Sequence, residues 1–338
     1  ALTNVYEAWG LYRFTDAWSV KVGRMAWDYD NARFLGDLRW AAQARSHDGL
    51  VISHNNTETK LRVDIGAAFN QVGFEPTMLA ETFYSGVNNY KTNQFLYLHK
   101  GLSKTKFSVL IHNDGRQVPA DSSLAMRQTY GLIGSGSIGS LDVGGEFYYQ
   151  GGKNASDVEV DAFLINAFVK LKTALTPITI GFDYLSGTSV TDTQDKSFNP
   201  LYGTNHKFYG YMDYFYVGNA HGQAGNTAGL FDVHLKTNFQ VGDRGSLAAN
   251  THVFQSAATL VNPTDFNIEE SKYLGTEVDL VYTLKMDENV KFNLGYSQMF
   301  AGESMELVKT VTTEASSVNN WLWVMIDFNP SIVVKKLE

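Results

Sequence analysis

The sequence contains no cysteine, little proline and no long hydrophobic run. The absence of cysteine excludes disulfide bonds, thiolate metal sites and cysteine nucleophiles. No apolar stretch approaches the ~18 residues that a transmembrane helix requires. Basic charge is also scarce, because 27 Lys and Arg stand against 35 Asp and Glu, for a net charge of −8. This balance argues against nucleic acid as a partner.

Aromatic residues and glycine are abundant, with 21 Phe, 18 Tyr and 30 Gly. The main pattern is a two-residue alternation, which places successive side chains on opposite faces of a sheet. Within residues 60–69, one phase is apolar and the other is largely charged or small. The apolar phase consists of Leu61, Val63, Ile65, Ala67 and Phe69. The same alternation occurs at residues 140–149, 231–239 and 274–284. The pattern predicts an all-β protein.

Three features favour a transmembrane antiparallel β-barrel over a soluble sandwich. The alternating segments run to roughly 10–14 residues, against about 5–6 in soluble strands. Aromatic residues lie near strand ends, as in interfacial girdles. Short turns alternate with long loops, which is typical of outer-membrane barrels. We therefore expect one barrel domain over residues 1–330, followed by a tail at 331–338, integral to the bacterial outer membrane with its lipid and lipopolysaccharide.

Fifteen strands are expected in this sequence, with the first and the last both running toward the short-turn side. Bacterial single-chain barrels have even strand numbers and both termini on that side. We therefore expect 16 or 18 strands in the complete protein, with at least one strand preceding Ala1. Either number leaves an aqueous lumen.

The segment near 24–47 interrupts the alternation and combines apolar residues with charges of both signs. Its four arginines are Arg24, Arg33, Arg39 and Arg45. A loop of this composition is expected to fold into the lumen and narrow it. Guanidinium groups stay charged and pair bidentately with carboxylates, so that they could form an anion-binding constriction. The interleaved aspartates could equally pair with these arginines and pin the loop. Because Arg24 shares its phase with the outward Val20 and Val22, it reaches the lumen only if the strand ends or bulges near Gly23.

Two stretches resemble the alginate-export family of outer-membrane porins. The first comprises Gly23-Arg24, Tyr29-Asp30, Arg33-Phe34-Leu35-Gly36, Trp40, Arg45 and Asp48, and the second runs from Leu201 to Asp213. The sequence departs from the family pattern at Met25 and His47. The resemblance implies an eighteen-stranded porin, of which this chain would lack the first three strands. It also implies an arginine constriction that selects anionic solutes, in some members an acidic polysaccharide. Arg24, Arg33 and Arg45 match the family arginines, whereas Arg39 has no clear counterpart.

Other candidate pore residues lie on the strands and in a second loop. The inward phase is expected to line the lumen with Lys60, Arg62, Asp64, Arg127, Lys170 and Lys236. Because acidic residues share this phase, the sign of the charge at the narrowest point cannot be read from the pattern. The long loop near 188–226 is expected to cover the extracellular mouth. Its contacts with the barrel or its inner loops are assigned to His206, Lys207 and Tyr209.

These patterns favour passive passage of anionic solutes, including acidic oligosaccharides or polysaccharides. One alternative is a non-conducting barrel that acts as an adhesin or binds a partner protein of the envelope. A barrel enzyme with a site at the rim is a further alternative, for which His47-Asp48 and His206 near Asp213 are candidates. The sequence lacks a Gly-x-Ser-x-Gly nucleophile motif, and we expect no enzymatic activity. No cofactor is expected. Oxygen ligands in the long loops could hold Ca²⁺, but no spacing identifies a site.

Overall fold

The computed structural model describes residues 5–41, 43–70, 89–309 and 315–330, and one antiparallel sheet of fifteen strands dominates it. The strands of this sheet are β1 (Ala8–Arg13), β2 (Trp18–Met25), β3 (His47–Asn56), β4 (Leu61–Phe69), β5 (Thr92–Gly101), β6 (Thr105–Gln117), β7 (Leu124–Ile138), β8 (Leu141–Lys153), β9 (Glu159–Leu171), β10 (Ile178–Leu185), β11 (Leu230–Val241), β12 (Gly245–Gln255), β15 (Tyr273–Asp287), β16 (Val290–Ala301) and β17 (Val318–Phe328). Each strand pairs with the next, and β12 pairs with β15 because the separate hairpin of β13 (Val261–Asn262) and β14 (Asp265–Glu269) stands between them.

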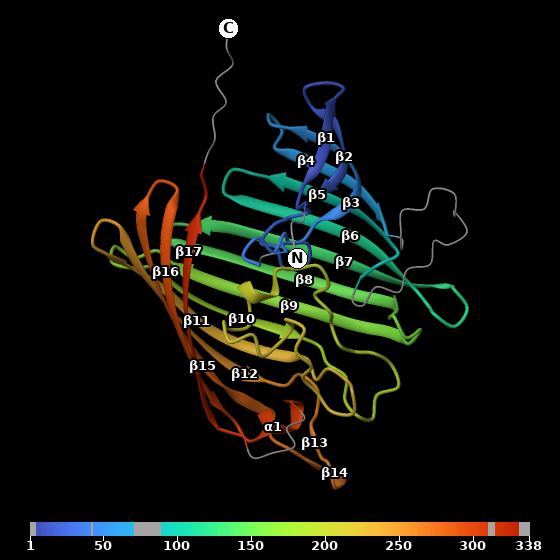
Figure 1. Cartoon of the computed structure of the whole chain (residues 1–338), viewed down its shortest axis with the longest axis vertical. Coiled ribbons are helices and arrows are strands. Elements are labelled where there is room, and N and C mark those ends of the chain that lie inside the picture. The colour runs from blue at the N-terminus through green and yellow to red at the C-terminus, as the bar shows by residue number, and fades with distance from the viewer. Residues whose placement is uncertain (1–4, 42, 71–88, 310–314, 331–338) are drawn as a thin grey trace.

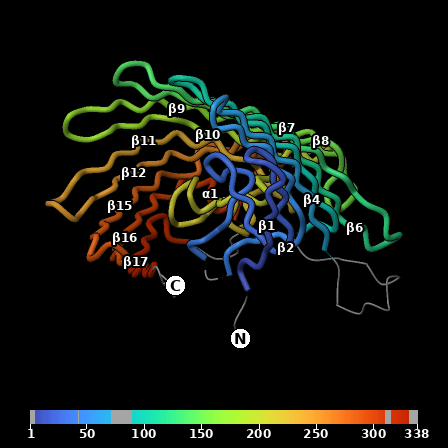
Figure 2. The backbone as a smooth tube through the Cα atoms, turned by 90° about the horizontal axis from the view of Figure 1, so that it is seen from above, coloured from blue at the N-terminus to red at the C-terminus, as the bar shows by residue number. Residues whose placement is uncertain are grey.

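The sheet curves into an open barrel, whose concave side we call the lumen (Figures 1 and 2). Its edge strands are β1 and β17, and within the described residues each of them pairs with one neighbour only. The expected all-β antiparallel class and the count of fifteen strands are confirmed. Additional strands that would close the barrel stay a prediction.

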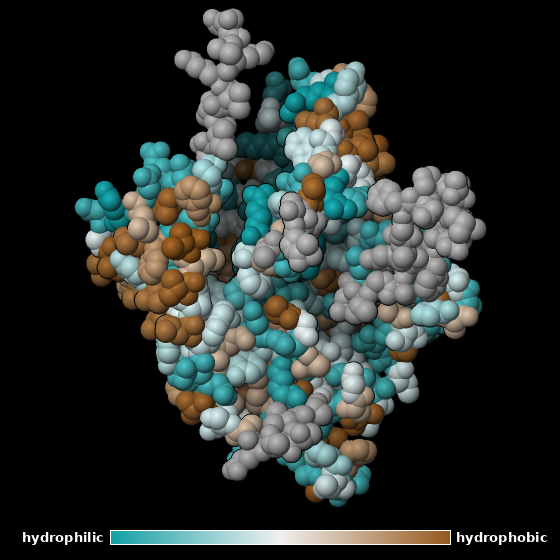
Figure 3. Space-filling model, viewed as in Figure 1, coloured by the Kyte–Doolittle hydropathy of each residue, from teal (hydrophilic) through white to brown (hydrophobic). Residues whose placement is uncertain are grey.

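The register separates an apolar outer face from a polar inner face. On β4, Ile65 is 54% exposed on the outer face, whereas the carboxylate-bearing Asp64 is fully buried on the inner face. This agrees with the alternation, because a slip of one residue would exchange the two faces. Viewed toward its open side, the molecule carries hydrophilic residues around the concavity and hydrophobic residues on the flanking edges (Figure 3). Among the described residues, no helix has the length and apolarity needed to cross a bilayer.

Two connecting segments fill much of the lumen, and together we call them the plug. The first is residues 26–46, between β2 and β3, and the second is residues 186–229, between β10 and β11. Both lie within the curve of the sheet in two perpendicular views (Figures 1 and 2). The second segment contains a short 3₁₀ helix, η1 (Asn205–Lys207). We expected this segment to cover the extracellular mouth and to pack against the barrel or its inner loops. It does pack inward, with Phe215 fully buried, and its place at the extracellular mouth stays a prediction.

Helix α1 (Ser304–Lys309) packs against the second plug segment. The ammonium group of Lys309 donates hydrogen bonds to the carbonyl oxygens of Tyr214 and Ala220. Burial lowers the pKa of Lys309 to about 8. The tail expected at 331–338 lies outside the described residues, as does most of the loop between β4 and β5.

Candidate functional site: the plugged lumen

The two plug segments are joined by backbone contacts. Leu35 and Tyr202 form an isolated parallel bridge, and the amide of Gly36 donates to the carbonyl of Tyr202 at 2.9 Å. The amide of Thr204 donates to the carbonyl of Ala32 at 2.8 Å. These bonds make one body of two segments that lie about 160 positions apart in the chain.

This close approach depends on two glycines. A Cβ atom at Gly203 would stand 2.0 Å from the carbonyl oxygen of Arg33, and one at Gly36 would stand 2.4 Å from the hydroxyl of Thr204. Both positions therefore require a residue without a side chain. Gly36 and Gly203 belong to the two stretches that carry the family resemblance, and the structure brings those stretches into contact.

Arg33 is the centre of a buried ion-pair network that ties the plug to the wall. Its guanidinium lies 3.1 Å from the carboxylate of Glu146 on β8 and 2.9 Å from that of Asp183 on β10. It also donates to the hydroxyl of Tyr209 at 3.1 Å and stacks over the ring of Phe208 at 4.0 Å. Burial alone would lower the pKa of Arg33, but the carboxylates of Asp183 and Glu146 outweigh burial and raise the pKa above its ordinary value. The positive charge of Arg33 is therefore balanced by the carboxylates of Glu146 and Asp183.

A second set of polar contacts fixes the start of the plug against β4, β5 and β6. The hydroxyl of Tyr29 donates to Asp64 at 2.8 Å, and Asp30 accepts from Ser108 at 2.7 Å. Arg62 lies on the inner face as expected and pairs with Asp64 at 2.5 Å. The charge of Arg62 is therefore balanced by Asp64, the same carboxylate that accepts the hydrogen bond from Tyr29 of the plug.

Arg24 and Arg39 lie apart from the inner network. Arg24 pairs with Asp48 at 2.7 Å across β2 and β3, on the same face of the sheet as the outward Val22. Gly23 has a φ of +125°, but the pairing of β2 with β1 and β3 continues through it without a register shift, so the bulge that would turn Arg24 inward is not formed. The side chain of Arg39 is 69% exposed and pairs with Asp37 at 2.7 Å. Arg24 nevertheless borders the same cavity of about 340 Å³ as Arg45, so two of the four arginines lie near one another, whereas Arg33 and Arg39 lie elsewhere.

Arg45 differs from the other three because its charge is not balanced locally. Its guanidinium donates to the carbonyl of Gly203 at 2.8 Å, and no described carboxylate lies within 4.0 Å of it. Burial lowers the pKa of Arg45 to about 10. The side chain borders two cavities of about 800 and 340 Å³ at the long-loop end of the lumen.

The three residues assigned to loop contacts all hold the plug together. His206 lies 2.7 Å from the carboxylate of Asp213 and stacks on Trp40 at 4.2 Å between ring centroids. Lys207 donates to the carbonyl of Asn31 at 2.8 Å. Tyr209 is the buried partner of Arg33 described above. Because these contacts fall within the plug, they account for its packing.

The basic residues assigned to the wall divide into paired and unpaired groups. Arg127 is buried on β7 and lies 3.4 Å from Asp114. Lys236 on β11 and Lys170 on β9 have no described carboxylate within 4.0 Å. Thr179 on β10 is the register partner of both lysines, so their backbones stand two strands apart, about 10 Å. Lys60 was wrongly assigned to the wall, because it lies in the exposed turn before β4 with a φ of +53°.

Sequence reasoning missed two further features of the inner face. Lys104 and Lys106 border a hollow of about 840 Å³ with Lys170 at the short-turn end, and neither has a described carboxylate within 4.0 Å. The gathering of these lysines depends on pairing across four strands, which the sequence pattern does not show. Asp232, His234 and His252 form the second feature, a compact buried cluster on β11 and β12. The Asp-x-His spacing on β11 was visible in the sequence, whereas the register that adds His252 was not.

Long antiparallel strands with an apolar outer face and a charged inner face define an integral β-barrel channel of the bacterial outer membrane. The family model described as alginate export matches residues 1–319, and the chain belongs to this family. No curated protein matches the sequence.

Solved structures of Pseudomonas aeruginosa outer-membrane proteins share the fold. OccK10 (OpdN) aligns with a TM-score of 0.64 at 13% identity, covering 96% of this chain and 83% of its own. OccD3 (OpdP) aligns with a TM-score of 0.58 at 13% identity, covering 92% and 74%. OpdK, in its structure with vanillate, aligns with a TM-score of 0.57 at 10% identity, covering 92% and 75%. At these identities the similarity defines the fold alone.

Proposed function

We propose that this outer-membrane channel passes anionic solutes past the unpaired cations of its lumen. The supporting observation is the set of basic groups that border the lumen or its end cavities and have no described carboxylate within 4.0 Å: Arg45, Lys104, Lys106, Lys170 and Lys236. A charge already neutralised by a neighbour attracts a mobile ion weakly, whereas an unbalanced one attracts it from within a Debye length. Selectivity therefore rests on Arg45 and the wall lysines, and Arg33 serves as an anchor.

The unbalanced cations occur at both ends of the lumen. Arg45 borders the cavities at the long-loop end, and Lys104, Lys106 and Lys170 border the hollow at the short-turn end. Ammonium and guanidinium groups bind carboxylates and phosphates, so the solutes are small organic acids and acidic oligosaccharides. The structure of OpdK with vanillate, a carboxylate, is a consistent precedent in a protein of the same fold.

The plug favours a second candidate, a non-conducting barrel that binds a partner in the envelope. Its buried aromatic residues and ion pairs occupy space that an open pore would leave to water. A purified protein that inserts into planar bilayers without conducting current would support this candidate. Ion-selective current would support the channel.

The proposal is tested by reversing the charges of two of these basic residues, Arg45 in the plug and Lys236 on the wall. A unit charge at about 7 Å in water interacts by ~0.6 kcal/mol, so reversing its sign changes the local anion concentration about sevenfold before screening. The variant Arg45→Glu with Lys236→Glu should therefore shift the zero-current potential toward cation selectivity at low salt. The matched control is Arg39→Glu, because Arg39 is exposed and paired with Asp37.

The control should keep the selectivity of the unchanged protein. Equal zero-current potentials for the double variant and the unchanged protein, with both folded, would contradict the proposed path. Folding is checked by heat-dependent migration in SDS gels.

A further inference from the structure

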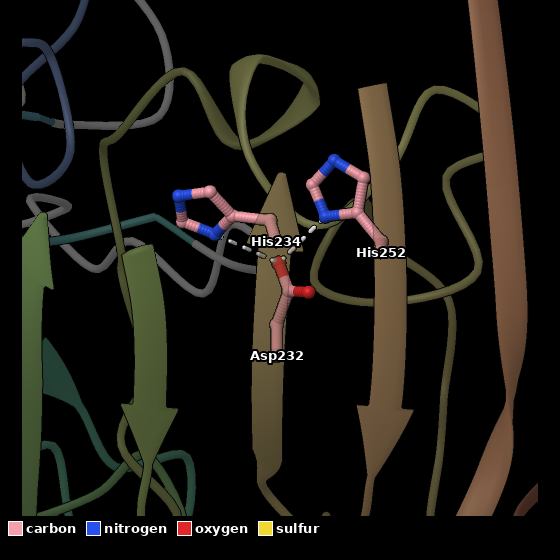
Figure 4. A group of neighbouring side chains, drawn as sticks. All are labelled: Asp232, His234 and His252. Atoms are coloured by element: carbon pink, nitrogen blue, oxygen red, sulfur yellow. Dashed lines mark hydrogen bonds and ion pairs between the residues drawn. The ribbon is translucent and has the colours of Figure 1, made fainter. Parts of the chain in front are cut away.

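The cluster of Asp232, His234 and His252 has the composition and geometry of a metal site. Asp232 and His234 are two residues apart on β11 and so face the same side, and His252 is the register partner of His234 on β12. One ligand atom from each residue lies within 4.8 Å of the others. Figure 4 shows both imidazole rings turned toward the carboxylate of Asp232.

The distances are close to those that a tetrahedral ion requires. The Nδ1 atom of His252 lies 2.7 Å from Oδ2 of Asp232, and Nδ1 of His234 lies 3.7 Å from the same oxygen. Bonds of about 2.0–2.1 Å at a tetrahedral angle place two ligand atoms about 3.3 Å apart. The shorter distance must therefore lengthen by about 0.6 Å and the longer one shorten by about 0.4 Å, while all three ligand atoms already lie within 4.8 Å of one another.

The cluster also contains buried polar atoms that the described protein leaves without a hydrogen-bond partner. These atoms are Oδ1 of Asp232 and Nδ1 of His234, in side chains that are 0% and 7% exposed. Buried polar groups are almost always paired, and exceptions call for an explanation. A plain histidine–carboxylate hydrogen bond accounts for His252, but it leaves His234 turned toward the same carboxylate without a bond.

The charge around the cluster suits a dication. Asp232 is anionic, and Asp183 contributes a second carboxylate 3.7 Å from Nδ1 of His234. Arg33 pairs with Asp183 but is shared with Glu146, so the two carboxylates outweigh the one arginine. Lys236, two residues beyond His234 on β11, opposes a cation and sets a limit on affinity.

We propose that Asp232, His234 and His252 form a binding site for a divalent transition-metal ion in the lumen wall. Imidazole nitrogens with one carboxylate favour Zn²⁺, Ni²⁺ or Co²⁺ over Ca²⁺, which takes oxygen ligands. The ion would cross-link β11 and β12 beneath the second plug segment. An imidazole nitrogen coordinates a metal only when it carries no proton, so the ion takes the place of the hydrogen bond between Nδ1 of His252 and Asp232.

The test is equilibrium dialysis of the full chain in detergent micelles against Zn²⁺ at neutral pH. One saturable ion per chain is expected. His234→Gln and His252→Gln should each weaken Zn²⁺ binding at least about tenfold, as loss of a ligand does. The matched control is His99→Gln, because His99 is also on the inner face but bonds to Ser108 at 2.9 Å.

Two further measurements keep the result decisive. Asp232→Asn preserves the side-chain shape and should also lose the site, which covers the case in which a histidine variant fails to fold. Bound Co²⁺ should give the intense visible absorption of a four-coordinate ion in the unchanged protein and lose it in Asp232→Asn. The absence of saturable Zn²⁺ binding, or equal binding by His234→Gln, His252→Gln and Asp232→Asn, would overturn the proposal.

Discussion

Deletion of residues 198–216 should raise the single-channel conductance several-fold. This part of the plug includes Tyr202, Tyr209 and Phe215, which are at most 4% exposed inside the curve of the sheet. Conductance depends on the open cross-section and on the barriers along the pore, and removing side chains that fill the lumen increases the first. The effect should be large, because the segment also releases its partner, residues 26–46.

The control deletion removes residues 263–268, which form the turn of the β13–β14 hairpin and most of β14. These residues are exposed and belong to a separate two-stranded sheet, so their loss should leave conductance unchanged. Conductance is measured in planar bilayers on both variants. An unchanged conductance after deletion of 198–216 would mean that current avoids the plug, and the assignment of the plug as the constriction would fail.

Replacing Arg33 with Met should destabilise the protein by about 3–5 kcal/mol. Removal of one member of a buried ion-pair network leaves its partners as uncompensated buried charges. Here the orphaned groups are the carboxylates of Glu146 and Asp183, both on the barrel wall. Methionine keeps much of the volume, so the loss reports charge more than packing. The measurement is equilibrium unfolding in guanidinium chloride in detergent or lipid.

Two further variants separate charge from shape. Arg33→Met combined with Glu146→Gln and Asp183→Asn removes the orphaned charges and should regain most of the lost stability. Arg39→Met should change stability by no more than about 0.5 kcal/mol, because an exposed ion pair contributes little. Equal stability of Arg33→Met and the unchanged protein would show that the network does not anchor the plug.

The strand architecture was predictable because the alternation of apolar and polar residues within each strand shows which side chains face outward and which face the lumen. Asp64 and Ile65 lie on opposite faces because successive residues of a strand alternate between the two faces, and this alternation can be read from the local sequence. Strand number and the short turns followed from the same pattern. Inward packing of the second plug segment was expected, but its docking on the first was not predictable, because Gly203 meets the backbone of Arg33 across a long stretch of sequence.

The candidate pore residues show where local reasoning stops. Arg33 and Arg45 look alike in the sequence, yet one lies between two carboxylates and the other has none within 4.0 Å. This difference arises from the register of β8 and β10, which brings Glu146 and Asp183 together. The interpretation of arginines as structural pins describes Arg33, while the anion-path hypothesis stays a proposal for Arg45.

The zero-current potential of the unchanged protein tests the central claim most directly. It is measured in planar bilayers across a tenfold KCl gradient at low salt, where the Debye length reaches about 30 Å at 0.01 M. Because Arg45 and the wall lysines are unpaired, we expect a zero-current potential whose sign shows that chloride permeates more readily than potassium. A potential of the sign carried by potassium, or inserted protein without current, would contradict an anion-passing channel.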